Sequence, residues 1–506
     1  MSDESVRSAL RSAAPLVVVE APAGCGKTHQ GADYAREVAS ARDTGRPLIL
    51  THTHAACSVF AERTRGASRG VEIRTIDSVI GQIATAYHRG LDLPVDTAAW
   101  VRERDDGYQQ LASRVAQLLT RHKFIAAAIA RRHPIVICDE HQDSSADQHS
   151  VVMSLLDQGA RVRVFTDPMQ QIYPNKRRAG AASGVGAGAQ PFSGAIADVL
   201  DYPHRWTRGD PALGRWILTA RESLKMGGKI DLRGALPECV QVAFAENQAE
   251  KKLDYRLSAE SRRPVEDFER AQASLFVLTH FNDTSQSLRA FFNRSIPLWE
   301  GSARDGLDEM VGAMLRAAND RNALASAVVD FIGAVGIGFG ASAFGDRFKT
   351  EVRDGCVRPC KGKPAKIQEL ARHIVADPTH RGVARMLRHL SELVISDASF
   401  HGIKFDRRRE FWDAVHLGEF ETPSAGIAEL SHRRTHLRPK PPAKAVSTIH
   451  KSKGLECESV IVMPCDANTF PDKPSARCLL YVALSRATTR VLLVVSRNHP
   501  SPLLEF

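Results

Sequence analysis

Short runs of apolar residues, many of them β-branched, recur along the chain and are separated by longer stretches with helical periodicity. Apolar runs without strict alternation are typical of parallel strands buried on both faces of a sheet. The runs form two groups, one at 15–22, 46–54, 134–140 and 160–168, and one at 273–280, 457–464 and 489–496. The pattern therefore predicts an α/β protein with two parallel-sheet cores.

Two long segments, 81–134 and 296–440, lack such runs and have helical periodicity. Each separates strands of one core, so we interpret each as a largely helical inserted subdomain. Segment 175–194 is rich in Gly, Ala and Ser, which indicates a flexible loop. The predicted domains are a first core at 1–80 and 135–199, a small helical insertion at 81–134, a second core at 200–295 and 441–506, and a helical accessory insertion at 296–440.

The chain has 506 residues, a net charge of +10 and nine scattered cysteines. It contains no apolar run of the ~20 residues that a membrane-spanning helix needs. Its polar start, MSDESVRSAL, does not resemble a signal peptide. The spacing of the cysteines matches no disulfide framework, which indicates reduced thiols, so we expect a cytoplasmic protein. The positive charge favours a polyanionic partner only weakly, because many basic proteins bind no nucleic acid.

A phosphate-binding loop is predicted in VVVEAPAGCGKTH (17–29), where a strand, a small-residue turn and a helix start follow one another. Small residues let backbone N–H groups surround phosphates at the positive end of a helix. Lys27 would reach the β- and γ-phosphates, and the Thr28 hydroxyl would bind Mg²⁺. Ala21 stands where the strict motif has glycine, and a plain glycine turn before a helix is the alternative. The loop residues are Ala23, Gly24, Cys25 and Gly26. We therefore expect ATP and Mg²⁺.

The segment RRHPIVICDEHQDSS (131–145) ends an apolar run in two adjacent carboxylates, Asp139 and Glu140. The carboxyl ends of parallel strands are where α/β sheets bind ligands. In a nucleotide site, Asp139 would hold Mg²⁺, and Glu140 would orient and activate the attacking water. Mg²⁺ would also offset the repulsion between the carboxylates. A solvated strand end is the alternative, and Lys27 upstream argues against it.

Two further segments would complete such a site. FTDPMQQIYP (165–174) places Gln170 after a second acidic strand end, where a neutral amide can bind a γ-phosphate or its attacking water. LLYVALSRATTRVLLVVS (479–496) carries Arg486 in an otherwise apolar stretch. Arg486 is either a surface residue that extends its charge to solvent or an arginine finger that neutralises the transferred phosphoryl group.

In their order and spacing, these segments resemble the motif series of superfamily 1 helicases of the UvrD/Rep/PcrA type. The resemblance covers both cores but not the two insertions. It implies two RecA-like cores with ATP between them and single-stranded DNA, or a single/double-strand junction, bound across both, with 3′→5′ movement. The matching segments are APAGCGKT (21–28), LTHTHAACSVFAER (50–63), IRTIDSV (73–79), CDEHQDS (138–144), TDPMQQIY (166–173), LDYPHRW (200–206), STIHKSKGLE (447–456) and YVALSRA (481–487).

The resemblance also implies roles for residues of the second core. Arg205 and Arg486 would both reach the γ-phosphate and act with Glu140 and Gln170, while Glu456 would contact the nucleotide sugar. Because these arginines come from the opposite core, ATP would close the cleft and hydrolysis would release it. DNA contacts would come from His52, Thr53, Tyr173 and His450, with a core aromatic as the alternative for Tyr173.

Several positions depart from the family pattern. Some of these positions would contact the base of the nucleotide, and others would contact the DNA strand. We therefore expect base recognition and strand binding to differ from those of the family. At the base, the family's adenine-reading Gln is replaced by Val6 and Arg7, and its adenine-stacking Tyr is replaced by His204. In segment 50–63, His52 and Ala55 replace an aromatic residue and a Lys. In segment 73–79, Asp77 and Val79 replace a His and a Phe.

The leading hypothesis is an ATP-driven translocase or helicase on single-stranded DNA. The alternative is an ATP-switched nucleic-acid sensor that regulates a partner nuclease, because size and motif order also resemble the helicase subunit of the antiphage Gabija system. Basic segment 432–444 is interpreted as a solvated linker or a phosphate contact. A zinc site is the lesser interpretation of Cys356, Cys360, His373 and His380, because their spacing fits no standard finger. No oligomeric state is predicted.

Overall fold

Two compact units make up the chain, Met1–Phe291 with Ser447–Phe506, and Phe292–Val446. No helix in the described residues is both long enough and apolar enough to span a bilayer. The computed structural model describes residues 2–40, 45–66, 70–102, 104, 106–173, 192, 194–246, 249–251, 254–299, 305–317, 320–339, 344–436 and 441–506.

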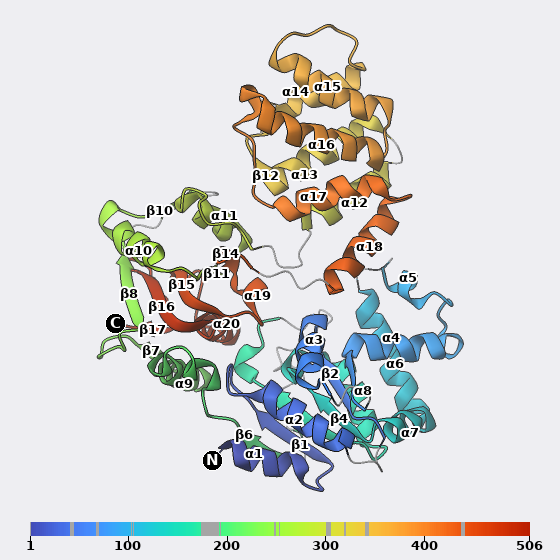
Figure 1. The fold of residues 1–506 in the computed structure, drawn as a ribbon, viewed down its shortest axis with the longest axis vertical. Helices are drawn as coiled ribbons and strands as arrows, with labels where there is room; N and C mark the ends of the chain where they lie inside the picture. The colour runs from blue at the N-terminus through green and yellow to red at the C-terminus, as the bar shows by residue number, and fades with distance from the viewer. Residues whose placement is uncertain are drawn as a thin grey trace. The chain divides into compact units, whose positions relative to one another are not determined.

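The first sheet is parallel throughout. Within the described residues it has six strands in the order β3-β2-β4-β5-β1-β6, and each neighbouring pair is parallel. Its strands are β1 (Leu16–Glu20), β2 (Leu48–Thr51), β3 (Glu72–Thr75), β4 (Ile135–Cys138), β5 (Arg161–Thr166) and β6 (Ile196–Val199). Figure 1 labels β1, β2, β4 and β6.

Alternate residues of these strands face two separate hydrophobic clusters. In β4, Ile135 and Ile137 belong to one cluster, and Val136 and Cys138 belong to the other. Successive side chains of a strand point to opposite faces, so a strand covered on both faces is apolar at every position. The covering helices are α1 (Ser2–Arg11), α2 (Lys27–Ser40) and α3 (His54–Arg63) on one face, and α4 (Ile76–Ala86), α5 (Thr97–Arg102), α6 (Gly107–Arg121), α7 (Lys123–Arg132) and α8 (Ala146–Leu156) on the other.

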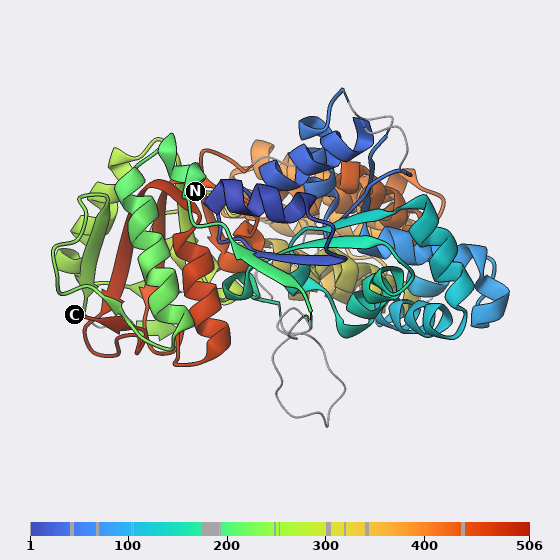
Figure 2. The same ribbon diagram turned by 90° about the horizontal axis from the view of Figure 1, so that it is seen from below.

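The second sheet has the order β14-β11-β15-β16-β8 among the described strands, and the pairs from β11 to β8 are parallel. Figure 2 shows its red strands beside green and red helices. The strands are β8 (Val240–Ala245), β11 (Leu275–Thr279), β14 (Lys444–Thr448), β15 (Cys457–Cys465) and β16 (Ala487–Ser496), and the helices packed near them are α9 (Pro211–Lys225), α10 (Ala259–Ala271), α11 (Asn282–Phe291), α19 (Ile449–Ser452) and α20 (Pro474–Leu484). Short strands pair as β7 (Ile230–Asp231) with β17 (Leu504–Glu505), and β9 (Ala249–Lys251) with β10 (Asp254–Arg256).

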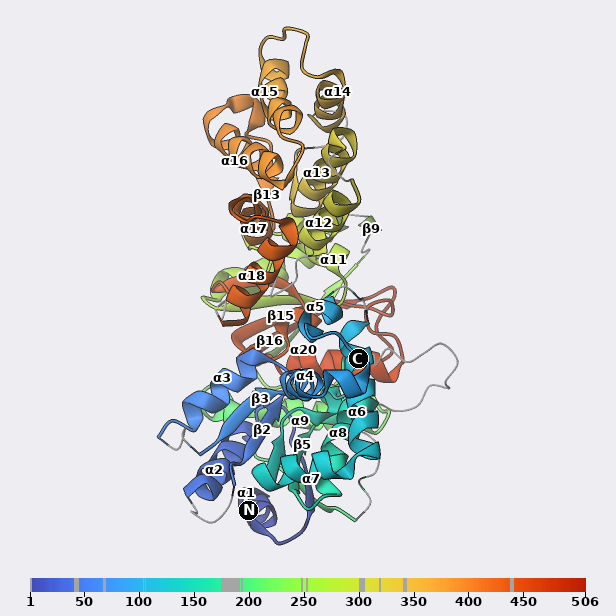
Figure 3. The ribbon, with the colours of Figure 1, turned by 90° about the vertical axis from the view of Figure 1, so that its right-hand side faces the viewer.

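The second unit is mainly helical, as Figure 3 shows for its labelled helices. Its core is rich in phenylalanine, and Phe331, Phe348, Phe400 and Phe411 are almost fully buried. Its elements are α12 (Asp305–Ala317), α13 (Arg321–Val335), α14 (Asp346–Asp354), α15 (Lys363–Ala376), α16 (His380–Ser396), α17 (Arg408–His416), α18 (Pro423–His436) and the antiparallel pair β12 (Gly336–Ile337) and β13 (Lys404–Phe405).

The predicted fold class is confirmed: two parallel-sheet cores of RecA-like type carry largely helical insertions. The exact domain boundaries stay a prediction. The loop predicted at 175–194 lies almost entirely outside the described residues, and so do the side chains of 432–440 in the basic segment.

Candidate functional site

The predicted phosphate-binding loop joins β1 to α2 and contains two glycines with positive φ. Gly24 has φ +73° and Gly26 has φ +87°, a region that favours glycine. A Cβ at Gly24 would lie 2.7 Å from Cβ of Arg205, and one at Gly26 would lie 3.1 Å from Cδ2 of His204. These glycines therefore allow the segment η5 (His204–Thr207) to pack directly against the loop.

A cavity of about 850 Å³ opens beside this loop. Its volume is within the range of small-molecule sites, which is roughly 300–1,000 Å³. Its walls come from α1, from the phosphate-binding loop and α2 of the first core, and from η5 and the starts of β15 and β16 of the second core. They include Gly24, Gly26, Lys27, Thr28, His204, Arg205 and Glu456, together with Asp3 and Arg7. Most residues predicted to bind the nucleotide are therefore brought together around one space.

Glu140 forms an ion pair with Lys27, the first residue of α2. The second carboxylate oxygen of Glu140 accepts a hydrogen bond from Nε2 of Gln142. Burial alone would raise the pKa of Glu140, but the adjacent Lys27 ammonium lowers it below its ordinary value. Glu140 also has φ +52°, which a non-glycine residue adopts only when its surroundings impose it. The fold thus holds this carboxylate ionised and in a fixed position.

Asp139 differs from its neighbour, because its Oδ1 is buried and has no hydrogen-bond partner among the described residues. Burial raises the pKa of Asp139, although Lys27 opposes this effect. A buried polar atom without a partner is unusual in a folded protein. Carboxylate and hydroxyl oxygens are the ligands that Mg²⁺ prefers. The Asp139 carboxylate and the Thr28 hydroxyl at the start of α2 therefore fit a magnesium ion.

The two arginines of the second core, Arg205 in η5 and Arg486 between α20 and β16, have different environments. Nε of Arg205 lies 2.6 Å from Oε2 of Glu456, and its Nη1 donates to the Ser485 carbonyl at 2.7 Å. Arg486 is 2% exposed, and its Nη1 donates to the Leu455 carbonyl at 3.0 Å. Burial lowers the pKa of Arg486 to about 10. Arg205 thus lines the cavity, while Arg486 is bound to the backbone beside it; the finger role of Arg486 stays a prediction.

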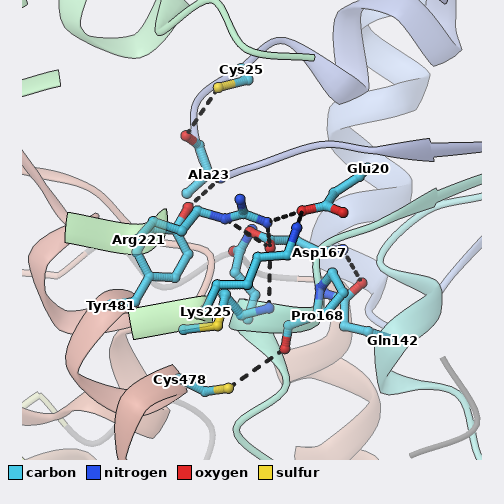
Figure 4. A network of polar contacts seen from close by, with 12 residues as sticks. Glu20, Ala23, Cys25, Gln142, Asp167, Pro168, Arg221, Lys225, Cys478 and Tyr481 are labelled. Carbon is cyan, nitrogen blue, oxygen red and sulfur yellow. Dashed lines mark hydrogen bonds and ion pairs between the residues drawn. The ribbon is translucent and has the colours of Figure 1, made fainter. Parts of the chain in front are cut away.

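A buried ion pair joins the loop after β5 to α9 (Figure 4). Nη2 of Arg221 lies 2.7 Å from Oδ1 of Asp167, and their side chains are 1% and 0% exposed. Oδ2 of Asp167 accepts a hydrogen bond from Nε2 of Gln170 at 2.8 Å. The backbone N–H of Asp167 donates to Oε1 of Gln142 at 3.0 Å. Gln170 is therefore fixed through Asp167 to α9, which packs near the second sheet. Sequence reasoning missed Arg221, whose signal is a charge on the apolar stripe of α9.

The second sheet also reaches the phosphate-binding loop through α20 and η5. The Ala23 N–H donates to Oη of the fully buried Tyr481 at 2.8 Å, as Figure 4 shows. Nε1 of Trp206 donates to the Ala487 carbonyl at 2.8 Å. Cys25, a residue of the loop itself, is buried. Neither Ala23 nor Cys25 lines the cavity, so their predicted contact with phosphate is a proposal.

Among the predicted DNA-binding residues, the structure brings Tyr173 and His450 together. Oη of Tyr173 donates to the His450 carbonyl at 3.2 Å, and Tyr173 is 49% exposed. The Thr53 hydroxyl accepts from the Ala56 N–H and caps α3. His52 is bonded to Ser144. His52 and Thr53 thus lie after β2, where each has a structural partner.

A chain of hydrogen bonds extends from His52 into the first core. Nε2 of His52 lies 3.1 Å from Oγ of Ser144, which lies 3.2 Å from Nδ1 of His141. Nε2 of His141 is 3.0 Å from Nδ1 of His149. Burial lowers the pKa of His141 to about 3 and also lowers the pKa of His52 and His149. All three imidazoles are therefore neutral at neutral pH.

Acidification from pH 7 to pH 5 is expected to destabilise the protein through His141. In the unfolded chain this histidine binds a proton near pH 6.5, whereas in the folded chain it does so near pH 3. Between these values the unfolded state binds more protons, so stability falls as the pH falls. At pH 5 the loss from this residue is about 2 kcal/mol.

Urea unfolding at both pH values checks this expectation with two variants. His141→Gln should lose less stability on acidification than the wild type, because glutamine does not titrate. His122→Gln, at an exposed histidine, should lose as much as the wild type. An equal loss in all three proteins would contradict the assignment.

The four residues weighed as a zinc site have other partners. Nε2 of His380 bonds to the Phe420 carbonyl, and Nε2 of His373 bonds to His389. Across the described part of the chain, no group of three or more His, Cys, Asp or Glu residues is placed to hold a metal ion. The structure therefore gives the zinc interpretation no support.

Two family models match the chain. One describes an AAA domain and matches residues 3–176, and the other describes a UvrD-like helicase C-terminal domain and matches residues 445–494. A comparison with curated proteins found no match. The first match contains Lys27, Glu140 and Gln170, and the second contains Glu456 and Arg486. With one domain of each kind, the chain is similar to superfamily 1 helicases of the UvrD/Rep type, which supports a helicase and ATPase function on nucleic acid.

Proposed function

We propose that the chain is an ATP-dependent motor on single-stranded DNA, a translocase or helicase that moves 3′→5′. The observation that carries this proposal is the cavity whose walls hold Lys27 and Thr28 of α2, in the first core, together with Arg205 of η5 and Glu456 before β15, in the second core. A nucleotide in this cavity contacts both sheets at once. Its binding and hydrolysis can therefore change how the two sheets are held together.

Lys27 has two alternative partners in this proposal. Without phosphate it neutralises Glu140, as in the structure. A triphosphate attracts the same ammonium group and leaves Glu140 free to accept a proton from the attacking water. The Asp139 and Thr28 oxygens would hold Mg²⁺, which neutralises phosphate charge when bound. Nucleotide binding thus prepares the base that hydrolysis needs.

Arg205 carries the signal from the nucleotide to the second sheet. Its guanidinium lines the cavity and is also bonded to Ser485 and Glu456. Its positive charge attracts the transferred phosphoryl group, and this attraction weakens once phosphate leaves. Gln170, held through Asp167 to Arg221, would move with the second sheet. Repeated closure and opening would alternate the grip on a bound strand.

Strand displacement tests direction and duplex separation. We expect ATP-dependent release of a labelled strand from a duplex with a 3′ single-stranded tail, and no release from one with a 5′ tail. The opposite preference would contradict the polarity. ATP hydrolysis without any strand release or translocation would instead favour the sensor that regulates a partner nuclease. Neither family match bears on the likeness to the Gabija subunit, which stays a prediction.

A further inference from the structure

A row of four aromatic rings runs across the first unit. Tyr173, which follows β5 and η3 (Pro168–Gln170), lies 5.9 Å from His450 of α19 between ring centroids. His450 lies 5.7 Å from His280, at an interplanar angle of 29°. His280 lies 4.1 Å from Phe281, at 22°. The last three rings therefore form a continuous stack.

The ends of the row are open to solvent and its middle is fixed. Tyr173 is 49% exposed and Phe281 is 40% exposed. Nδ1 of His280 is bonded to the Thr469 carbonyl at 3.2 Å, and Tyr173 is bonded to the His450 carbonyl. Burial lowers the pKa of both imidazoles, so they are neutral. The row thus presents fixed, uncharged π-faces with an accessible ring at each end.

Cationic groups lie beside both ends of this row. Nζ of Lys453 lies 5.1 Å from the Tyr173 ring centroid, but its charge is paired with Asp143 at 2.6 Å. Nζ of Lys451 lies 3.2 Å from Oδ1 of Asn282, the residue next to Phe281. The row also begins where β5 and β11 end, at the carboxyl edges of two parallel sheets, which is where such sheets bind ligands.

We propose that His280 and Phe281 form a base-stacking subsite for single-stranded nucleic acid, continuous with Tyr173 and His450. This proposal rests on the proposed function and names residues that the motif series left unassigned. Binding of single strands without sequence preference combines aromatic faces for the bases with cations for the phosphates. The row supplies the aromatic faces and Lys451 is the cation beside it, and a base can stack on the exposed face of Phe281.

The test compares two ligands, a single-stranded oligonucleotide and an abasic oligonucleotide of the same length, by fluorescence anisotropy. Phe281→Ala is expected to weaken binding of the normal oligonucleotide by about 5- to 150-fold. Binding of the abasic ligand should change little, because it offers no base to stack. Phe281→Trp should bind the normal oligonucleotide as the wild type does. Phe124→Ala, at a ring 68% exposed on α7, is the matched control and should match the wild type with both ligands.

Two results would overturn the subsite while leaving the motor intact. One is a Phe281→Ala variant that binds the normal oligonucleotide as tightly as the wild type. The other is an equal loss of affinity for both ligands, which would indicate a general structural effect. A wild type that binds no single-stranded oligonucleotide would overturn the subsite and the proposed function together. Tyr173→Ala, at the other end of the row, separates these cases because it should weaken binding even if Phe281 plays no part.

Discussion

Replacing Glu140 with glutamine is expected to lower the rate of ATP hydrolysis by a factor of about 10² to 10⁴, the usual contribution of a general base. The amide has nearly the same shape but cannot accept a proton from water. Nucleotide binding should be no weaker than in the wild type, because Lys27 loses the carboxylate that competes with phosphate for it. Steady-state hydrolysis and equilibrium binding of a fluorescent ATP analogue measure the two effects separately.

Glu260→Gln is the matched control for this variant, since Glu260 is an exposed carboxylate in the first turn of α10. It should hydrolyse ATP at the wild-type rate. If Glu140→Gln retained the wild-type rate, Glu140 could not be the base. If it lost nucleotide binding as well as hydrolysis, the carboxylate would be needed to shape the site rather than to accept a proton.

Arg221→Met is expected to lower the free energy of unfolding of the first unit by about 3–5 kcal/mol. The change leaves Asp167 buried without its cationic partner, and a buried unpaired charge is strongly destabilising. Burial alone would lower the pKa of Arg221, but Asp167 raises it above its ordinary value, so the guanidinium is held charged. Urea unfolding followed by circular dichroism measures the effect.

Arg215→Met is the matched control, because Arg215 lies on the exposed face of the same helix. It should change stability little. The double variant Asp167→Leu with Arg221→Met should regain much of the lost stability, since it leaves no charge unpaired. The account of this ion pair would be wrong if Arg221→Met were no less stable than Arg215→Met.

The sheets and the phosphate-binding loop could be predicted because their signals are local. A strand such as β4 is apolar at every residue, which a covered parallel strand requires. The Gly24 and Gly26 positions follow from a turn that needs positive φ. Lys27 and Thr28 follow at the helix start, and both line the cavity. Each of these features is defined by residues close together in the chain.

Features that depend on distant segments could not be predicted in the same way. Asp167 and Arg221 are 54 positions apart, and no local pattern shows that one faces the other. The hydrogen bond from Arg486 to the Leu455 carbonyl joins residues 31 positions apart, and the expected contact of Arg486 with the γ-phosphate stays a prediction. Phe281 lies next to a predicted strand, and only the ring contacts connect it to His450 through His280. Such pairings depend on how the sheets pack against each other, and this packing cannot be derived from a single sequence.

Steady-state ATP hydrolysis by the purified wild type, with and without single-stranded DNA, tests the central claim most directly. The account predicts that single-stranded DNA raises the rate and that Glu140→Gln lowers both the basal and the stimulated rate by a factor of about 10² to 10⁴. Hydrolysis at the same rate with and without DNA, or no hydrolysis under either condition, would contradict a motor that works on single-stranded DNA.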